Sequence, residues 1–74
     1  MENNIAAKVK KLRKERKYSQ EELAKEIGIH QTTISQIENG SREANRKHLI
    51  KYADFFNVNL DWLLGVEKKK RANN

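Results

Sequence analysis

The sequence predicts an all-α fold, a compact bundle of five short helices within residues 1–65. Proline, which interrupts helices, is absent, and Gly28, Gly40 and Gly65 each stand where a helix is expected to stop. Apolar residues recur at helical spacing between these points. The chain has 74 residues, of which 36% are hydrophobic, so we expect a single small domain.

The first two predicted helices are marked by apolar spacing and by one strong N-terminal signal. Ser19 is a favoured N-cap residue, and Glu22, three residues later, completes a capping box that starts the second helix. Gly28 ends that helix, because glycine can take the positive φ that a tight turn needs. The inner face consists of Ile5, Val9 and Leu12 in the first helix, which runs to about Lys17, and of Leu23, Ala24 and Ile27 in the second.

The third helix follows the turn at Gly28. Ile34 and Ile37 supply its inner face, and the small Ala24 lets the second and third helices cross closely. Asn39-Gly40 ends it, since both residue types tolerate the left-handed C-terminal conformation. The order of cap, alanine, glycine and isoleucine is typical of a helix-turn-helix that binds DNA.

Two more helices and a tail complete the chain. Asn45 can cap the fourth helix, and Asn59 can cap a short fifth helix, Leu60–Leu64, that ends at Gly65. Residues 66–74 show no apolar periodicity, so we expect a flexible basic tail. The predicted inner face of the fourth helix is formed by Leu49, Ile50, Ala53 and Phe56.

A helical wheel of the third helix separates a core side from an uncharged polar side. With about 100° per residue, Ile34 and Ile37 point to the core, and Glu38 lies at the core boundary. No charged residue occurs from His30 to Ile37, although 35% of the chain is charged. Uncharged hydrogen-bonding side chains are the kind that read base edges in the major groove. The outward residues are Thr32, Ser35, Gln36 and Asn39, with Gln31 on the flank and Thr33 beside them.

The net charge of +6 is unevenly distributed. Residues 1–18 carry seven basic and two acidic groups, whereas residues 19–40, which include the helix-turn-helix, carry one basic and four acidic groups. Attraction to phosphate must therefore come from the flanking segments. The candidates are Lys8, Lys10, Lys11, Lys14, Lys17, Arg42, Arg46 and Lys47.

Three motifs resemble one known family. The chain resembles Cro/lambda-repressor-like (Xre-type) helix-turn-helix domains over roughly residues 4–65. The motifs are Ser19-Gln-Glu-Glu-Leu-Ala24, Ile34-Ser-Gln-Ile-Glu-Asn-Gly40 and Val58-Asn-Leu-Asp-Trp-Leu-Leu64. The resemblance implies a five-helix domain whose third helix enters the major groove, in a protein that binds a palindromic operator as a dimer and represses transcription.

The resemblance also implies roles for individual residues. Gln20 corresponds to a phosphate contact that supports the third helix, and Asn39 to another phosphate contact. Arg13 and Glu38 correspond to a pair that ties the first helix to the end of the third. The base-reading positions are Gln31, Thr32 and Gln36. The dimer contact corresponds to the fifth helix, where we expect Leu60, Trp62 and Leu63.

Other classes of protein have less support in the sequence. No catalytic constellation or phosphate-binding glycine-rich loop is present, so an enzyme is not expected. With no Cys and with an isolated His48, neither a metal nor a cofactor is expected. Nonspecific nucleic-acid binding predicts a charged third helix, contrary to the sequence. An antitoxin-like subunit that binds a protein partner stays open. No apolar run reaches membrane-spanning length and no signal peptide is recognisable, which predicts a cytoplasmic protein.

Overall fold

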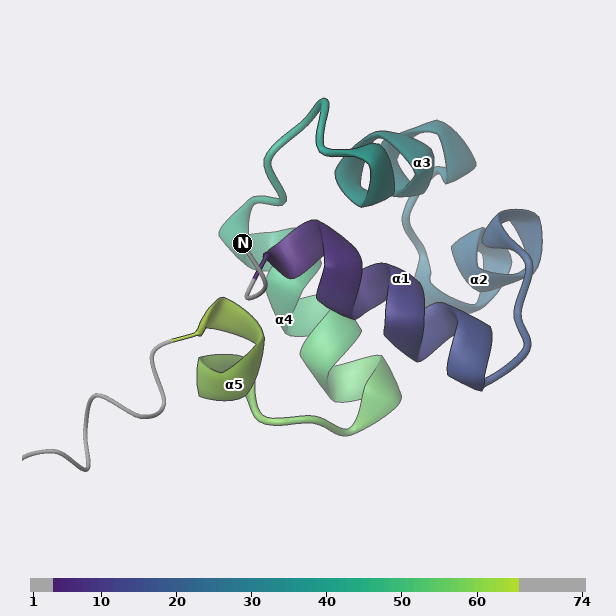
Figure 1. The fold of residues 1–74 in the computed structure, drawn as a ribbon. Coiled ribbons are helices and arrows are strands. Elements are labelled where there is room, and N and C mark those ends of the chain that lie inside the picture. The colour runs from purple at the N-terminus through teal and green to yellow at the C-terminus, as the bar shows by residue number, and fades with distance from the viewer. Residues whose placement is uncertain (1–3, 66–74) are drawn as a thin grey trace, which may run out of the picture.

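The computed structural model describes residues 4–65, which form five α-helices and no strand (Figure 1). This confirms the predicted all-α fold. The predicted tail, residues 66–74, lies outside the described residues. The helices are α1 (Ile5–Glu15), α2 (Gln20–Ile27), α3 (Gln31–Asn39), α4 (Arg46–Phe56) and α5 (Leu60–Leu64).

One hydrophobic core joins all five helices. The largest side chains with almost no exposed surface come from every helix, so no helix stands apart from the core. They are Val9 in α1, Leu23 in α2, Ile34 and Ile37 in α3, Tyr52 and Phe56 in α4, and Leu63 in α5. Because α1 packs against both α3 and α5, its position determines how the helix-turn-helix sits on the rest of the domain.

Four of the five described helices begin at side-chain caps, whereas His30, before α3, makes no cap hydrogen bond. Ser19 and Glu22 form the complete capping box of α2: the Glu22 N–H donates to Ser19 Oγ, and the Ser19 N–H donates to Glu22 Oε1. Asn45 and Asn59 accept backbone N–H bonds at the starts of α4 and α5. Asn4, which the sequence analysis did not single out, caps α1 in the same way.

α1 ends earlier than the sequence predicts. The helix stops at Glu15, and Lys17 takes a left-handed conformation with φ of 61°. The N–H of Tyr18 then donates to the carbonyl of Arg13, which closes the helix end. This geometry usually uses glycine, and since lysine occupies the position here, the sequence carried no stop signal.

Ile50 does not face the core, contrary to the prediction. It is 46% exposed, whereas Leu49, Tyr52, Ala53 and Phe56 are buried. With about 100° per residue, the four buried residues fall within one arc of about 100°, and Ile50 lies about 60° beyond the edge of that arc. The buried side of α4 is therefore formed by Leu49, Tyr52, Ala53 and Phe56.

Candidate nucleic-acid interface

The turn between α2 and α3 fixes the direction of α3. Gly28 has φ of 77°, a left-handed conformation that is strained for a residue with a side chain. Ile29 follows it into the core with only 6% exposure. Lys51 of α4 donates from Nζ to the Gly28 carbonyl at 3.0 Å. Two interactions therefore fix the turn: Ile29 packs in the core, and Lys51 of α4 bonds to the Gly28 carbonyl.

The two sides of α3 differ as the wheel predicts. Ile34, Ile37 and Glu38 are buried, and the polar residues occupy the rest of the helix surface. Gln31 and Thr32, in the first turn, are fully on the exposed side. Of the remaining candidates, Asn39 is exposed, and Thr33, Ser35 and Gln36 are partly exposed. α3 thus presents an uncharged hydrogen-bonding surface to solvent.

A buried ion pair holds α3 against α1, which confirms the predicted pair. Arg13 donates from Nε to Glu38 Oε2 at 2.7 Å and from Nη2 to Glu38 Oε1 at 2.9 Å. Both residues are 8% exposed. A third donor, Arg13 Nη1, bonds the Tyr18 carbonyl at 2.8 Å. The hydrogen bond to Glu38 raises the pKa of Arg13.

Gln20 links α2 to the Arg13–Glu38 pair. It is the first residue of α2, and its Nε2 donates to Glu38 Oε1 at 3.1 Å. One carboxylate therefore receives bonds from α1 and α2 while belonging to α3. The contact fits a residue that supports α3, and the phosphate contact implied by the resemblance stays a prediction.

The basic candidates lie on exposed parts of the surface. Arg42 and Arg46 flank the start of α4, and both are exposed. The Lys11 side chain is 75% exposed and lies 4.0 Å from the Glu15 carboxylate. Arg42 also contacts α3 directly, because its Nε donates to Gln36 Oε1 at 3.0 Å. No pattern in the sequence points to this last contact, since it depends on the path of the linker.

The fifth helix divides its apolar residues between core and surface. Leu63 is fully buried in the domain's own core, so it has no surface to offer a second copy, contrary to the expected dimer contact. Trp62 and Leu64 are 38% and 37% exposed, and Leu60 is half-buried. Lys8 lies over the Trp62 ring, with Nζ 4.8 Å from the ring centroid, and donates to the Trp62 carbonyl.

Two buried polar atoms belong to side chains of α4, Tyr52 and His48. Burial raises the pKa of Tyr52, and the charge of Glu38 adds to the rise. Burial also lowers the pKa of His48, with Arg42 as the largest electrostatic contribution. Tyr52 Oη and His48 Nδ1 have no hydrogen-bond partner within residues 4–65. No cluster of three metal-binding side chains occurs in this part of the chain.

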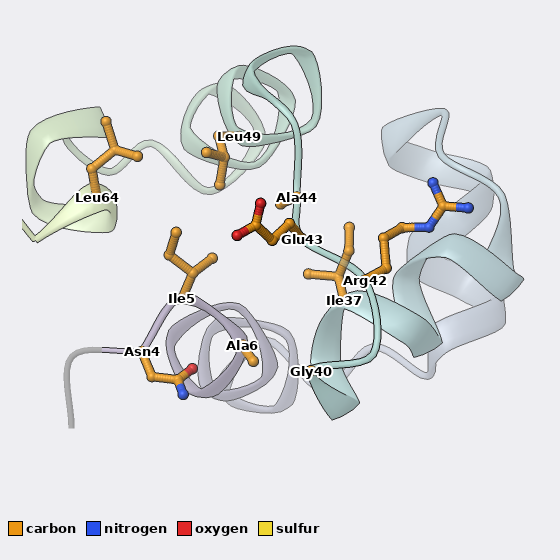
Figure 2. A pocket seen from close by; sticks show the side chains of 10 residues that line it. All are labelled: Asn4, Ile5, Ala6, Ile37, Gly40, Arg42, Glu43, Ala44, Leu49 and Leu64. Carbon is orange, nitrogen blue, oxygen red and sulfur yellow. The ribbon is translucent and has the colours of Figure 1, made fainter. Parts of the chain in front are cut away.

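A cavity of about 490 Å³ lies where the start of α1, the α3–α4 linker and the end of α5 meet (Figure 2). Its lining is aliphatic or glycine apart from Asn4, Arg42 and Glu43. Figure 2 shows Ile5 and Leu49 turned toward its centre, whereas Arg42 extends away from it. Its charged lining residues are one acid, Glu43, and one base, Arg42.

Comparison with known proteins supports the helix-turn-helix interpretation. The sequence pattern described as helix-turn-helix matches residues 9–63, most of the chain. The chain belongs to the helix-turn-helix family. The resemblance to Xre-type domains is thereby confirmed. The helix-turn-helix match extends from the middle of α1 to α5, so it includes the Arg13–Glu38 pair as well as the two helices of the motif.

Two regulators of Bacillus subtilis (strain 168) are similar to this helix-turn-helix domain. The chain is 36% identical over 64 residues to YqaE, an uncharacterized HTH-type transcriptional regulator, and 27% identical over 70 residues to the HTH-type transcriptional regulator ImmR. The alignments cover 86% and 95% of this chain but 55% of each relative, so the chain spans about half their length. No solved structure gives a significant match. Between residues 4 and 65, no helix combines the length and apolar character needed to cross a membrane.

Proposed function

We propose that this helix-turn-helix domain binds a specific DNA operator through α3, as a dimer, and represses transcription. The observation that carries the proposal is the uncharged outward surface of α3, held in place by the buried Arg13–Glu38 pair. A short helix with such a surface can place its side chains against base edges in the major groove. The regulator names of the two relatives are consistent with this function.

The polar residues of the interface take two kinds of role. Gln31, Thr32 and Gln36 read base edges, assisted by Thr33 and Ser35. Gln20 and Asn39 contact phosphates, and exposed Lys11, Arg42 and Arg46 supply attraction that is independent of sequence. This division explains how a motif with a net negative charge can bind DNA, since the charge that binds phosphate lies outside it.

Dimerisation uses the exposed apolar side of α5. A single small domain reads only a few base pairs, which is too little to select one site in a genome. Two copies related by a twofold axis double the readout and require a near-palindromic operator. Trp62 and Leu64 offer the exposed apolar surface for this contact, with Leu60 at its edge.

Selection of binding sites from random DNA tests the proposal. We expect one enriched near-palindrome with half-sites about one helical turn apart. Placing that operator within a promoter should lower the expression of a reporter when the protein is present. An enriched sequence with no change in reporter expression would remove the repressor role, and the absence of any enriched sequence would overturn the proposal.

Salt dependence should identify the residues that bind phosphate. Lys11→Ala and Arg46→Ala are each expected to weaken binding to all DNA sequences, because the charge that is removed acts on the DNA backbone. The slope of log K against log[salt] should become shallower by at most about 0.9 for each phosphate that is no longer neutralised. Titrations of operator and random DNA at several salt concentrations give this slope. A weakening confined to the operator would instead assign the residue to base reading.

Trp62→Ala should separate dimer contact from DNA reading. We expect weaker cooperative binding to the full operator and nearly unchanged binding to an isolated half-site, because Trp62 lies on α5 and not on α3. Ile50→Ala is a matched control, since Ile50 is a large apolar residue of comparable exposure that lies on α4 and not on α5. Equally weakened binding to half-site and operator, in a folded variant, would place the dimer contact elsewhere.

A further inference from the structure

The linker after α3 folds back onto the helix it leaves. Gly40 has φ of 83°, and the N–H groups of Ser41 and Arg42 both donate to the backbone carbonyl of Gln36, at 3.0 and 3.3 Å. The Ser41 N–H also donates to Asn39 Oδ1 at 2.9 Å. The backbone of Arg42 is therefore bonded to the backbone of Gln36, and the side chains of the same two residues are also in contact.

The side-chain contact determines which end of the Gln36 amide is available. Arg42 Nε donates to Gln36 Oε1 at 3.0 Å. A guanidinium has N–H donors and no acceptor, so the amide must turn its oxygen, not its NH₂ group, toward Arg42. Oxygen and nitrogen lie on opposite sides of the amide carbon, which turns the NH₂ group away from Arg42. Within residues 4–65 that NH₂ group makes no hydrogen bond.

We propose that Arg42 is a specificity-determining positioning residue, which holds the Gln36 carbonyl so that Gln36 reads bases with its NH₂ donor. The inference rests on the proposed function, since it concerns the base preference of α3. It gives Arg42 a role beyond attraction to phosphate. Figure 2 is consistent with this role, because the Arg42 side chain leaves the neighbouring cavity.

An amide whose oxygen is held beside a cation prefers a different base from a free one. A free glutamine pairs with adenine, because its oxygen accepts from N6 and its nitrogen donates to N7. Gln36 Oε1 keeps a second lone pair, but the Arg42 cation beside it favours the adjacent acceptors O6 and N7 of guanine over the N6 donor of adenine. Gln31 is exposed and has no hydrogen-bond partner among residues 4–65, so it can pair with adenine. The two glutamines of α3 therefore read different bases.

Binding-site selection with matched variants tests the assignment. The wild type should select guanine at the base read by Gln36, which is identified as the position whose preference disappears in Gln36→Ala. Arg42→Ala should shift that one position toward adenine by about 5-fold or more, the lower end for a bidentate contact. Arg42→Lys keeps the charge and still offers only donors, so it should retain the guanine preference with a salt slope close to that of the wild type.

Arg46→Ala controls for charge, because Arg46 is an exposed arginine at the start of α4 and, among residues 4–65, no contact ties it to Gln36. It should weaken binding to every sequence and leave the selected bases unchanged. Thermal unfolding verifies that each variant is folded. If Arg42→Ala lowers affinity without changing the preferred base, or if the wild type selects adenine at that position, the assignment is wrong while the proposed function stands. If the wild type selects no sequence, the proposed function itself fails.

Discussion

Arg13→Ala is expected to lower the free energy of unfolding by about 3–5 kcal/mol, the usual cost of removing one partner from a buried ion pair. The Glu38 carboxylate would be left at 8% exposure with the Gln20 amide as its one side-chain donor among residues 4–65. The Tyr18 carbonyl would also lose a hydrogen bond. Urea denaturation of the wild type and the variant measures the difference.

A double-mutant cycle shows whether the destabilisation belongs to the pair. Arg13→Ala with Glu38→Ala should recover part of the stability, because no uncompensated charge remains buried. Lys11→Ala is the control on the same helix: its contact with Glu15, at 4.0 Å, is exposed and should contribute about 0–1 kcal/mol. Additive effects of the two single substitutions would show that Arg13 and Glu38 do not stabilise one another.

Gln31→Ala and Gln36→Ala should each weaken operator binding by about 1–3 kcal/mol and barely change binding to random DNA. Binding to the operator should fall more than binding to random DNA, because neither side chain carries a charge that binds phosphate. Because Gln31 is exposed and Gln36 partly so, both variants should unfold close to the wild-type temperature. Titrations with operator and random duplexes give the two affinities. Two folded variants that bind the operator like the wild type would show that α3 is not the reading helix.

Local signals made most of the fold predictable. The capping box at Ser19 and the left-handed glycines at positions 28, 40 and 65 mark helix ends in a way that needs no tertiary context. The end of α1 was missed because Lys17 occupies a conformation that sequence alone assigns to glycine. Ile50 was misplaced because Tyr52, which was left out of the predicted inner face, shifts the buried side of α4 away from Ile50.

The site was predictable to different degrees. The outward surface of α3 follows from helical periodicity, so a wheel was sufficient. Arg13 and Glu38 are 25 residues apart, and only the family resemblance connected them before the structure did. The contacts of Gln20 with Glu38 and of Arg42 with Gln36 depend on rotamers and on the course of the linker. Neither a side-chain rotamer nor the path of a linker produces a periodic pattern in the sequence.

The carboxylate of Glu38 has a consequence for how α3 meets DNA. Because α1 and α2 both bond to it, α3 cannot separate from the bundle without breaking contacts in three helices. Its amide protons should therefore exchange with solvent mainly through unfolding of the whole domain. A helix that is already rigid before contact loses little conformational entropy on association, so more of the energy of its base contacts is retained as affinity.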